Sequence, residues 1–263
     1  MDEFTIAAFQ FCLTEGDVDA NIKTVESLAS SMDSAEPKIV VLPEMWPSGF
    51  DYPKLSEHAR RSDQIRDQMI RWSKEWHAVI VGSIAEMSDK GIVNRAYVID
   101  PVWEVVGTYD KTHLFSPHGE HLHFARGSNI LVVETTLCRI GVIICYDLRF
   151  PELCRLTALS GAEVLCVPAL WPLIRADHWR LLLRARAVEN QLFVVGCNGC
   201  GKIGNMDYPG ASAIVDPWGV VLSEGDNREQ IVRAVVHLKA IQEARKKIPC
   251  LTDRTELDRL KAE

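Results

Sequence analysis

Short runs rich in β-branched residues recur along the whole chain, and they constrain the fold more than any other feature of the sequence. They predict strands at TIAAFQF, KIVVLPE, AVIVGSI, NRAYVID, WEVVGTY, ILVVET, RIGVIIC, AEVLCVPA, QLFVVGC, SAIVDP and QIVRAVV. Between them lie stretches of helical spacing, such as the apolar stripe Ile65, Met69, Trp72 and Trp76. This is more strand than one doubly wound sheet contains.

Some of these runs are apolar throughout, which is typical of strands covered on both faces, whereas others alternate beside tight turns. The pattern predicts an α/β fold in which two mixed sheets pack together and helices cover the outer faces. No linker rich in Gly, Pro or Ser and no internal repeat divides the chain, so residues 1–263 are expected to form a single domain. The segment from about residue 248 is expected to be a tail across the surface or a partner subunit.

Charge and composition exclude several classes of function. The formal net charge of −7 provides no basic surface for a phosphate backbone, so nucleic acid is not an expected partner. No stretch reaches the roughly 20 apolar residues of a membrane span, and no signal peptide is evident at the N-terminus. The eight cysteines are therefore expected to be reduced thiols of a cytoplasmic protein.

Cys145 carries the sharpest local signal. It ends the apolar run RIGVIIC and precedes a polar turn, after which Pro151 and Glu152 favour the start of a helix. A cysteine at such a strand-to-helix elbow lies near backbone N–H groups and helix dipoles that favour the thiolate. Buried inert cysteines also end strands, so this alternative stays open for Cys145 taken alone.

Two charged residues also lie where a strand meets a loop. Glu44 follows KIVVLP beside apolar neighbours, which favour a raised carboxyl pKa suited to a general base. Lys111 leaves the run WEVVGTYD and is suited to stabilising an oxyanion, although a loop glutamate and a surface lysine are the simpler alternatives. With Cys145 they make a complete acyl-transfer set, provided that the three meet in space.

At these residues the chain resembles the nitrilase superfamily, through VLPEMW, YDKTHLF and ICYDLRFPE. The resemblance runs from about residue 5 to about residue 250 and implies a four-layer α-β-β-α sandwich with a Glu-Lys-Cys triad at Glu44, Lys111 and Cys145. It also implies that Glu120 in GEHLHFARG positions the lysine and the substrate, and that the protein is a homodimer.

The segments PEMWPSGFD, EHLHF and ARAVENQ and the pair Trp171-Pro172 narrow the resemblance within the superfamily. Through them the chain is most similar to omega-amidases, which hydrolyse 2-oxoglutaramate and related small amides. On this hypothesis Glu44 accepts the Cys145 proton, the sulfur attacks the amide carbon, and Lys111 with the backbone N–H of Tyr146 holds the oxyanion. Ammonia leaves, and water then hydrolyses the thioester without a metal or an organic cofactor. N-carbamoyl and aliphatic amide hydrolases use the same triad, so the substrate depends on the pocket.

Trp171 and Arg175 are the candidate substrate-binding residues. A bidentate guanidinium suits the remote carboxylate of an acidic amide better than a lysine does, but a structural ion pair of Arg175 with Asp177 or a neighbouring glutamate is an equally open alternative. The tail reads IPCLTDRTELDRL where omega-amidases commonly have an aromatic residue after IP, which bears on dimer contacts more than on chemistry.

Two other patterns indicate different chemistry. Histidines crowd one short segment beside Glu120, as zinc ligands do, but nothing like H-E-x-x-H is present. These histidines are His113, His118, His121 and His123. Cys197 and Cys200 form a C-x-x-C pair, which indicates a redox module or simply a strand end that enters a glycine-rich loop.

Overall fold

The computed structural model describes residues 3–32 and 38–255, and two six-stranded sheets form its centre. The first sheet contains β1 (Glu3–Gln10), β2 (Lys38–Val41), β3 (Ala78–Ser88), β4 (Gly91–Asp100), β5 (Glu104–Asp110) and β14 (Gln230–His237). The second contains β6 (Leu131–Glu134), β7 (Arg139–Val142), β8 (Val164–Ala169), β9 (Phe193–Asn198), β12 (Ala213–Val215) and β13 (Val221–Glu224). A separate hairpin consists of β10 (Cys200–Ile203) and β11 (Met206–Pro209).

The two sheets share one plan, with three parallel strands in the middle and antiparallel strands on both sides. The order is β14-β1-β2-β3-β4-β5 in the first and β13-β12-β9-β8-β7-β6 in the second. The parallel sets are β1-β2-β3 and β7-β8-β9. Since β5 is antiparallel to β4, which is antiparallel to β3, strands β2 and β5 point in the same direction.

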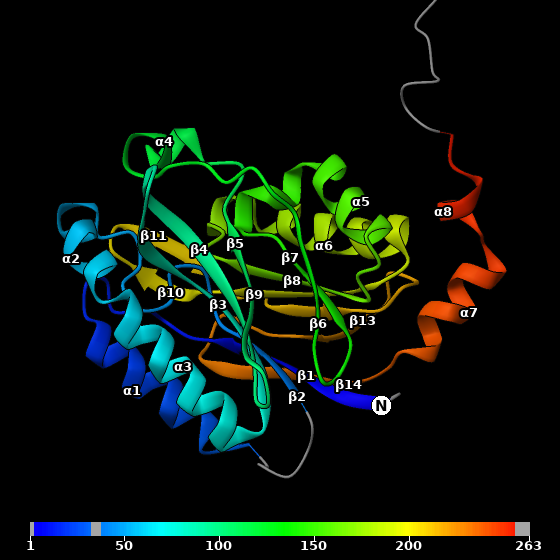
Figure 1. Ribbon diagram of the computed structural model, residues 1–263, viewed down its shortest axis with the longest axis horizontal. Coiled ribbons are helices and arrows are strands. Elements are labelled where there is room, and N and C mark those ends of the chain that lie inside the picture. Colours follow the sequence, from blue (N-terminus) through cyan, green and yellow to red (C-terminus); the bar gives the residue numbers. More distant parts are fainter. Residues whose placement is uncertain (1–2, 33–37, 256–263) are drawn as a thin grey trace, which may run out of the picture.

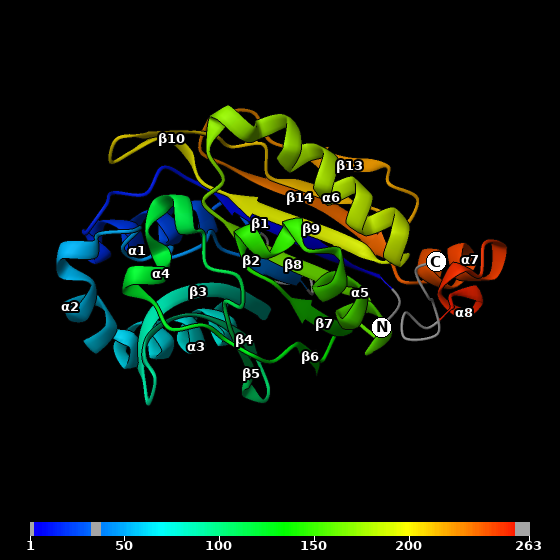
Figure 2. The same cartoon turned by 90° about the horizontal axis from the view of Figure 1, so that it is seen from above.

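Helices cover the outer face of each sheet, as Figures 1 and 2 show. The long ones are α1 (Val18–Ala29) and α3 (Ser62–Trp76) on the first sheet, and α5 (Pro151–Leu159) and α6 (Ala176–Asn190) on the second. Alternate residues of β2 serve the two sides, because Ile39 and Val41 belong to the core between the sheets whereas Val40 packs with the buried stripe of α3. This is the predicted α-β-β-α sandwich of two mixed sheets.

The loops that leave the strands carry short helices. These are η1 (Tyr52–Lys54), α2 (Leu55–Arg60), η2 (Ser116–His118), α4 (Glu120–His123), η3 (Cys145–Arg149) and η4 (Leu173–Arg175). The predicted strand that ended at Cys145 stops earlier, since β7 ends at Val142 and Cys145 is already the first residue of η3. The glycine-rich loop expected after Cys197 is instead the β10–β11 hairpin, whose Gly201 and Gly204 adopt positive φ angles.

The chain ends in two helices, α7 (Lys239–Lys247) and α8 (Cys250–Asp253), which lie to one side of the sheets in both views (Figures 1 and 2). The side-chain amide of Gln191 attaches α7 to the end of α6 by donating to the carbonyls of Ala244 and Ile248. The predicted tail thus contains a short helix, and its residues 256–263 lie outside the described part. None of the helices in the described ranges is long and apolar enough to cross a membrane.

Candidate active site

Glu44 lies in the loop after β2, and its side chain is fully buried. Its Oε1 accepts hydrogen bonds from Lys111 Nζ at 2.7 Å and from Asn94 Nδ2 at 2.9 Å. Its Oε2 accepts from the backbone N–H of Leu170, which follows β8 of the other sheet, at 3.1 Å. The next residue, Met45, turns the chain with a left-handed φ of 48°. These contacts hold both oxygens of the carboxylate in one orientation.

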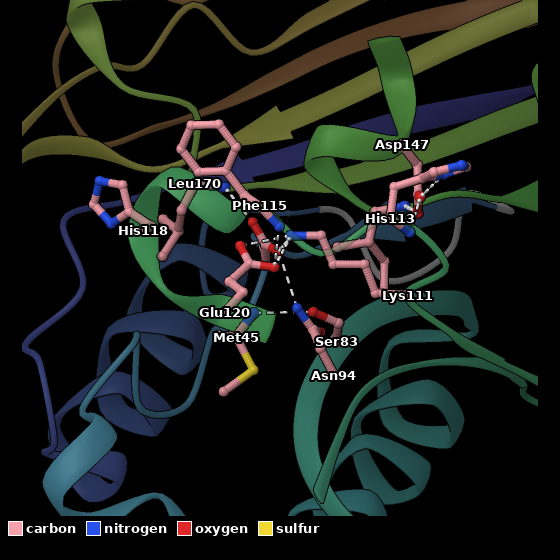
Figure 3. A network of polar contacts seen from close by, with 12 residues as sticks. Met45, Ser83, Asn94, Lys111, His113, Phe115, His118, Glu120, Asp147 and Leu170 are labelled. Carbon is pink, nitrogen blue, oxygen red and sulfur yellow. Dashed lines mark hydrogen bonds and ion pairs between the residues drawn. The ribbon is translucent and has the colours of Figure 1, made fainter. Parts of the chain in front are cut away.

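Lys111 follows β5, and its ammonium group lies between two carboxylates. Besides the contact with Glu44, its Nζ lies 2.9 Å and 2.8 Å from Oε1 and Oε2 of Glu120, the first residue of α4 (Figure 3). Glu120 is held in turn by the backbone N–H of Phe115, 3.1 Å from its Oε2. Burial alone would lower the pKa of Lys111, but the charges of Glu44 and Glu120 outweigh it and raise this pKa well above its ordinary value. The side chain is therefore a stable buried cation.

Cys145 occupies the elbow between β7 and α5, with a φ of 45° that residues other than glycine rarely adopt. The residue is 8% exposed, and its thiol is close enough to Glu44 for the carboxylate to influence its pKa. Burial, and then the negative charge of Glu44, raise the pKa of the Cys145 thiol well above its ordinary value, while Lys111 opposes the shift. Burial also raises the pKa of Glu44, again against Lys111. The resting site thus combines a neutral thiol with a carboxylate that is more basic than an exposed one.

The structure therefore brings together four residues that the sequence singled out. Glu44 and Lys111 come from the first sheet, Cys145 from the second, and Glu120 from the loop that joins the two. The burial of Glu44 and Lys111 rules out an ordinary loop glutamate and a surface lysine. The group supplies a nucleophilic atom, a proton acceptor in contact with it, and a cation beside both, which is the set that acyl transfer requires.

A pocket opens beside Cys145 and Glu120. Its walls are mainly aromatic and come from Phe50, Tyr52, Phe115, Tyr146, Trp171 and Tyr208. Tyr146, whose N–H was predicted to bind an oxyanion, directly follows Cys145, and its ring packs 4.9 Å from that of Phe115. Aromatic walls with a few polar groups suit a small molecule that has one polar end at the thiol.

Two guanidinium groups line the same pocket, those of Arg149 and Arg175. Arg149 lies 4.7 Å above the ring of Trp171, and Arg175 lies 5.4 Å from the ring of Phe115. The predicted alternative for Arg175 is wrong, because Asp177 pairs with Arg180 at 4.0 Å and neither pocket arginine forms an ion pair within residues 3–32 and 38–255. Burial and the neighbouring Arg175 lower the pKa of Arg149, as expected for two unneutralised cations side by side.

Sequence reasoning missed three of these features. Arg149 lies on the same turn as Cys145, so its spacing in the motif offered a signal for it. Asn94, in the middle of β4, and the backbone N–H of Leu170 offered none, because both reach Glu44 only through the tertiary fold.

The positions of the residues support neither a zinc site in the histidine segment nor a redox site at the C-x-x-C pair. The four histidines do not converge, since His113 hydrogen-bonds to Asp147 and His123 stacks on Tyr52, and the described residues contain no group of three side chains that could hold a metal ion. Cys197 and Cys200 are both free thiols, and Cys197 Sγ donates to the carbonyl of Phe9 at 3.3 Å.

Comparison with known proteins then identifies the family. The model of the carbon-nitrogen hydrolase family matches residues 5–246. The chain belongs to the carbon-nitrogen hydrolase family. This hydrolase is 38% identical to the 2-oxoglutaramate amidase of Bacillus subtilis over 95% of its own length and 97% of that protein. It is 37% identical to the omega-amidase YafV of Escherichia coli K12, over 83% of this chain and 84% of the relative.

Solved structures give the same assignment. A CN-hydrolase superfamily protein of Xanthomonas campestris, with an arsenic adduct in its active site, superposes on the hydrolase with a TM-score of 0.91 at 31% identity, covering 98% and 99% of the two chains. Nit3 of Saccharomyces cerevisiae, a nitrilase superfamily member, has a TM-score of 0.86 at 25% identity over 98% and 97%. The hydrolase is thus a nitrilase-superfamily enzyme that acts on carbon-nitrogen bonds other than peptide bonds.

Proposed function

We propose that the protein is an omega-amidase, which hydrolyses the terminal amide of a small 2-oxo acid such as 2-oxoglutaramate to the acid and ammonia. The observation that carries the proposal is the pairing, in one pocket, of the Cys145 site with two guanidiniums that have no carboxylate partner in the described residues. Two relatives with this substrate in their names, from Bacillus subtilis and Paenarthrobacter nicotinovorans, support it.

In the acylation step Glu44 accepts the thiol proton of Cys145 as the sulfur attacks the amide carbon. The carbonyl oxygen gains the negative charge, and the ammonium of Lys111 and the N–H of Tyr146 stabilise it. Glu44 then donates the proton to the amide nitrogen, the carbon-nitrogen bond breaks, ammonia leaves and a thioester remains on Cys145. Glu120 keeps Lys111 charged and in place through its 2.8 Å contact.

In the second step a water molecule enters the place that ammonia has left and hydrolyses the thioester. Glu44 takes a proton from the water while its oxygen attacks the thioester carbon, and the same two groups stabilise the second oxyanion. When the carbon-sulfur bond breaks, the proton returns to the sulfur, which restores the neutral thiol. A thiol with a raised pKa leaves and reforms in this way only beside a base, and Glu44 is the carboxylate whose charge acts on this thiol.

The remote carboxylate of the substrate binds to Arg149 and Arg175 in this proposal. Each guanidinium lies against an aromatic ring, Trp171 or Phe115, which limits its motion and faces it toward the pocket. The pocket lining includes one carboxylate in the described residues, Glu120, and its two oxygens are already engaged with Lys111 and the backbone N–H of Phe115. A 2-amino acid amide would therefore leave its ammonium unpaired, which favours the 2-oxo acid.

We also propose a cytoplasmic homodimer, with α6 in the interface. Leu181 and Val188 project from this helix at 66% and 49% exposure, and Trp218 and Val220 extend the same apolar surface. A β-carbon on Gly219 would lie 2.4 Å from Val188, so these segments are adjacent. Exposed apolar patches of this kind mark association sites. Leu181→Glu should yield a monomer by light scattering, and an unchanged mass would contradict this interface.

The substrate is tested by an ammonia-release assay on the purified protein. The panel contains 2-oxoglutaramate, 2-oxosuccinamate, glutamine, a simple nitrile and, as the carbamoyl substrate, N-carbamoyl-β-alanine. We expect activity on the first two alone. Faster turnover of the nitrile or the carbamoyl compound would contradict the proposal and favour another branch of the superfamily.

A further inference from the structure

Asp147 is a buried carboxylate to which the catalytic steps above assign no part. It lies two residues after Cys145, is fully buried, and accepts four hydrogen bonds. Oδ2 accepts from the backbone N–H of Ile144 at 3.0 Å and from the hydroxyl of Tyr109 at 2.8 Å. Oδ1 accepts from the backbone N–H of His113 at 2.9 Å and lies 2.8 Å from its Nδ1 (Figure 3).

The hydrogen-bond partners of Asp147 lie close in sequence to the two reactive residues, Lys111 and Cys145. Tyr109 and His113 lie two residues before and two residues after Lys111. Ile144 immediately precedes Cys145, so its N–H belongs to the elbow itself. One carboxylate therefore ties the segment of Lys111, at the end of the first sheet, to the segment of Cys145, at the end of a strand of the second.

A second contact strengthens the same connection. The imidazole of His113 stacks on the ring of Phe150, with centroids 3.5 Å apart and planes at 8°. Phe150 directly follows η3, so contacts with the Lys111 segment hold the elbow at both of its ends. These contacts matter because the left-handed φ of Cys145 is unfavourable and persists only when the surrounding structure holds it.

We propose that Asp147 is a positioning residue that fixes the Cys145 elbow relative to Lys111, and that Tyr109 and His113 are the groups through which it acts. This inference rests on the proposed function of Cys145 and Lys111. A shift of about 1 Å at such a site costs on the order of 10²-fold in rate. The connection thus determines how well the thiol meets both Glu44 and Lys111.

Asp100 offers a matched control. It is also fully buried, and it also accepts four hydrogen bonds, from the backbone N–H groups of Val102, Trp103 and Thr136 and from the Thr136 hydroxyl. It likewise joins two segments distant in sequence, but none of its partners adjoins the Cys145 site. Asp147→Asn and Asp100→Asn therefore remove the same kind of carboxylate with the same burial.

A milder pair of substitutions tests the connection between Asp147 and the Lys111 segment. Tyr109→Phe removes the hydrogen bond to Asp147 together with the contacts of the same hydroxyl with Thr112, and it leaves the N–H of Ile144 satisfied. Tyr97→Phe is its control, because Tyr97 is also buried and donates to a carboxylate, that of Glu86, on neighbouring strands. This pair decides the question should Asp147→Asn fail to fold.

The experiment measures kcat and KM on 2-oxoglutaramate and, without substrate, the alkylation rate of Cys145 by iodoacetamide, all well below each melting temperature. We expect Asp147→Asn to lower kcat and the alkylation rate by at least about 10-fold, with KM changed by less than about 3-fold. Tyr109→Phe should lower both rates by a smaller factor, whereas Asp100→Asn and Tyr97→Phe should leave them unchanged.

Equal rates in Asp147→Asn and wild type, or equal losses in Asp147→Asn and Asp100→Asn, would overturn the inference, since a purely structural carboxylate alters melting temperature alone. If only the two tyrosine variants fold, identical rates in Tyr109→Phe and Tyr97→Phe would overturn the inference. Failure of the proposed function is a separate result, namely wild-type enzyme that still releases ammonia after Cys145 is alkylated. The alkylation rates report on the connection even then, because they need no substrate.

Discussion

Cys145 and Cys197 begin from similar local sequences and reach different environments. Each ends an apolar run of the second sheet, each is buried, and burial raises the pKa of each thiol well above its ordinary value. Cys197 continues its strand as part of β9 and donates to the carbonyl of Phe9. Cys145 leaves β7, turns with a positive φ and meets Glu44.

The two thiols are both buried, so the difference between them lies in their neighbours. Among the described residues, no carboxylate or cation acts on the pKa of Cys197, which burial and two other cysteines raise and only the hydrogen bond to the Phe9 carbonyl lowers. Cys145 is equally desolvated, but segments of the first sheet bring a proton acceptor and an ammonium to it. Reactivity in this fold therefore depends on partners supplied from across the sandwich.

The strongest test of the comparison replaces each sulfur. Cys145→Ala should lower the rate of ammonia release by at least about 10³-fold, because the residues of a nucleophilic unit act together. Cys197→Ala, the matched control, should keep activity within about 2-fold. Comparable losses in both variants would show that the two sites do not differ as described.

Removal of the base should have nearly as large an effect. Glu44→Gln keeps the shape of the side chain but cannot accept the Cys145 proton, so we expect turnover to fall by about 10³-fold. The variant should still bind 2-oxoglutaramate, which isothermal titration can measure. Near-normal ammonia release from Glu44→Gln would end the assignment of Glu44 as the base.

The pH dependence sharpens the role of Glu44. Burial raises its pKa, and the base must be ionised to act, so activity should be lost as pH falls through that raised value. Below it, kcat/KM should drop by about 10-fold per pH unit. A profile that stays flat down to the ordinary pKa of a glutamate would contradict this prediction.

A smaller effect should separate recognition from chemistry. Arg175→Lys replaces a planar fork with a point charge, so KM for acidic amides should rise by about 10-fold while kcat and the turnover of neutral amides change little. Arg180→Lys, on the nearby α6 but already paired with Glu224, is the control. An equal rise of KM for neutral amides would refute the role of Arg175.

The smallest effect concerns stability. Cys197→Ala removes a buried sulfur and its contact with Phe9, so the free energy of unfolding should fall by about 1 kcal/mol. Denaturant titration measures this value. If Cys197→Ala lowered activity without lowering the free energy of unfolding, Cys197 would have a part in function and would not be a purely structural thiol.

Much of the fold was predictable because its strands are continuous β-branched runs, and the α3 stripe from Ile65 to Trp76 is buried as expected. The β10–β11 hairpin was missed because glycines interrupt it and its residues form no apolar run. Glu44, Lys111, Cys145 and Glu120 were found from motifs, but their contacts were not. Residues far along the chain from a motif, such as Leu170 at 126 positions from Glu44, or in mid-strand like Asn94, give no local sign that they approach it.

The sequence by itself determined the strand and helix periods, the family and the types of reactive group, since these depend on local pattern and composition. Only the tertiary structure decided that Lys111 lies between two carboxylates, that Arg149 and Arg175 stay unneutralised, and that Asp147 joins two sheets. The physical reason is that the basicity of a group and the charge around it depend on burial and on neighbours a few ångströms away, which chain separation does not encode.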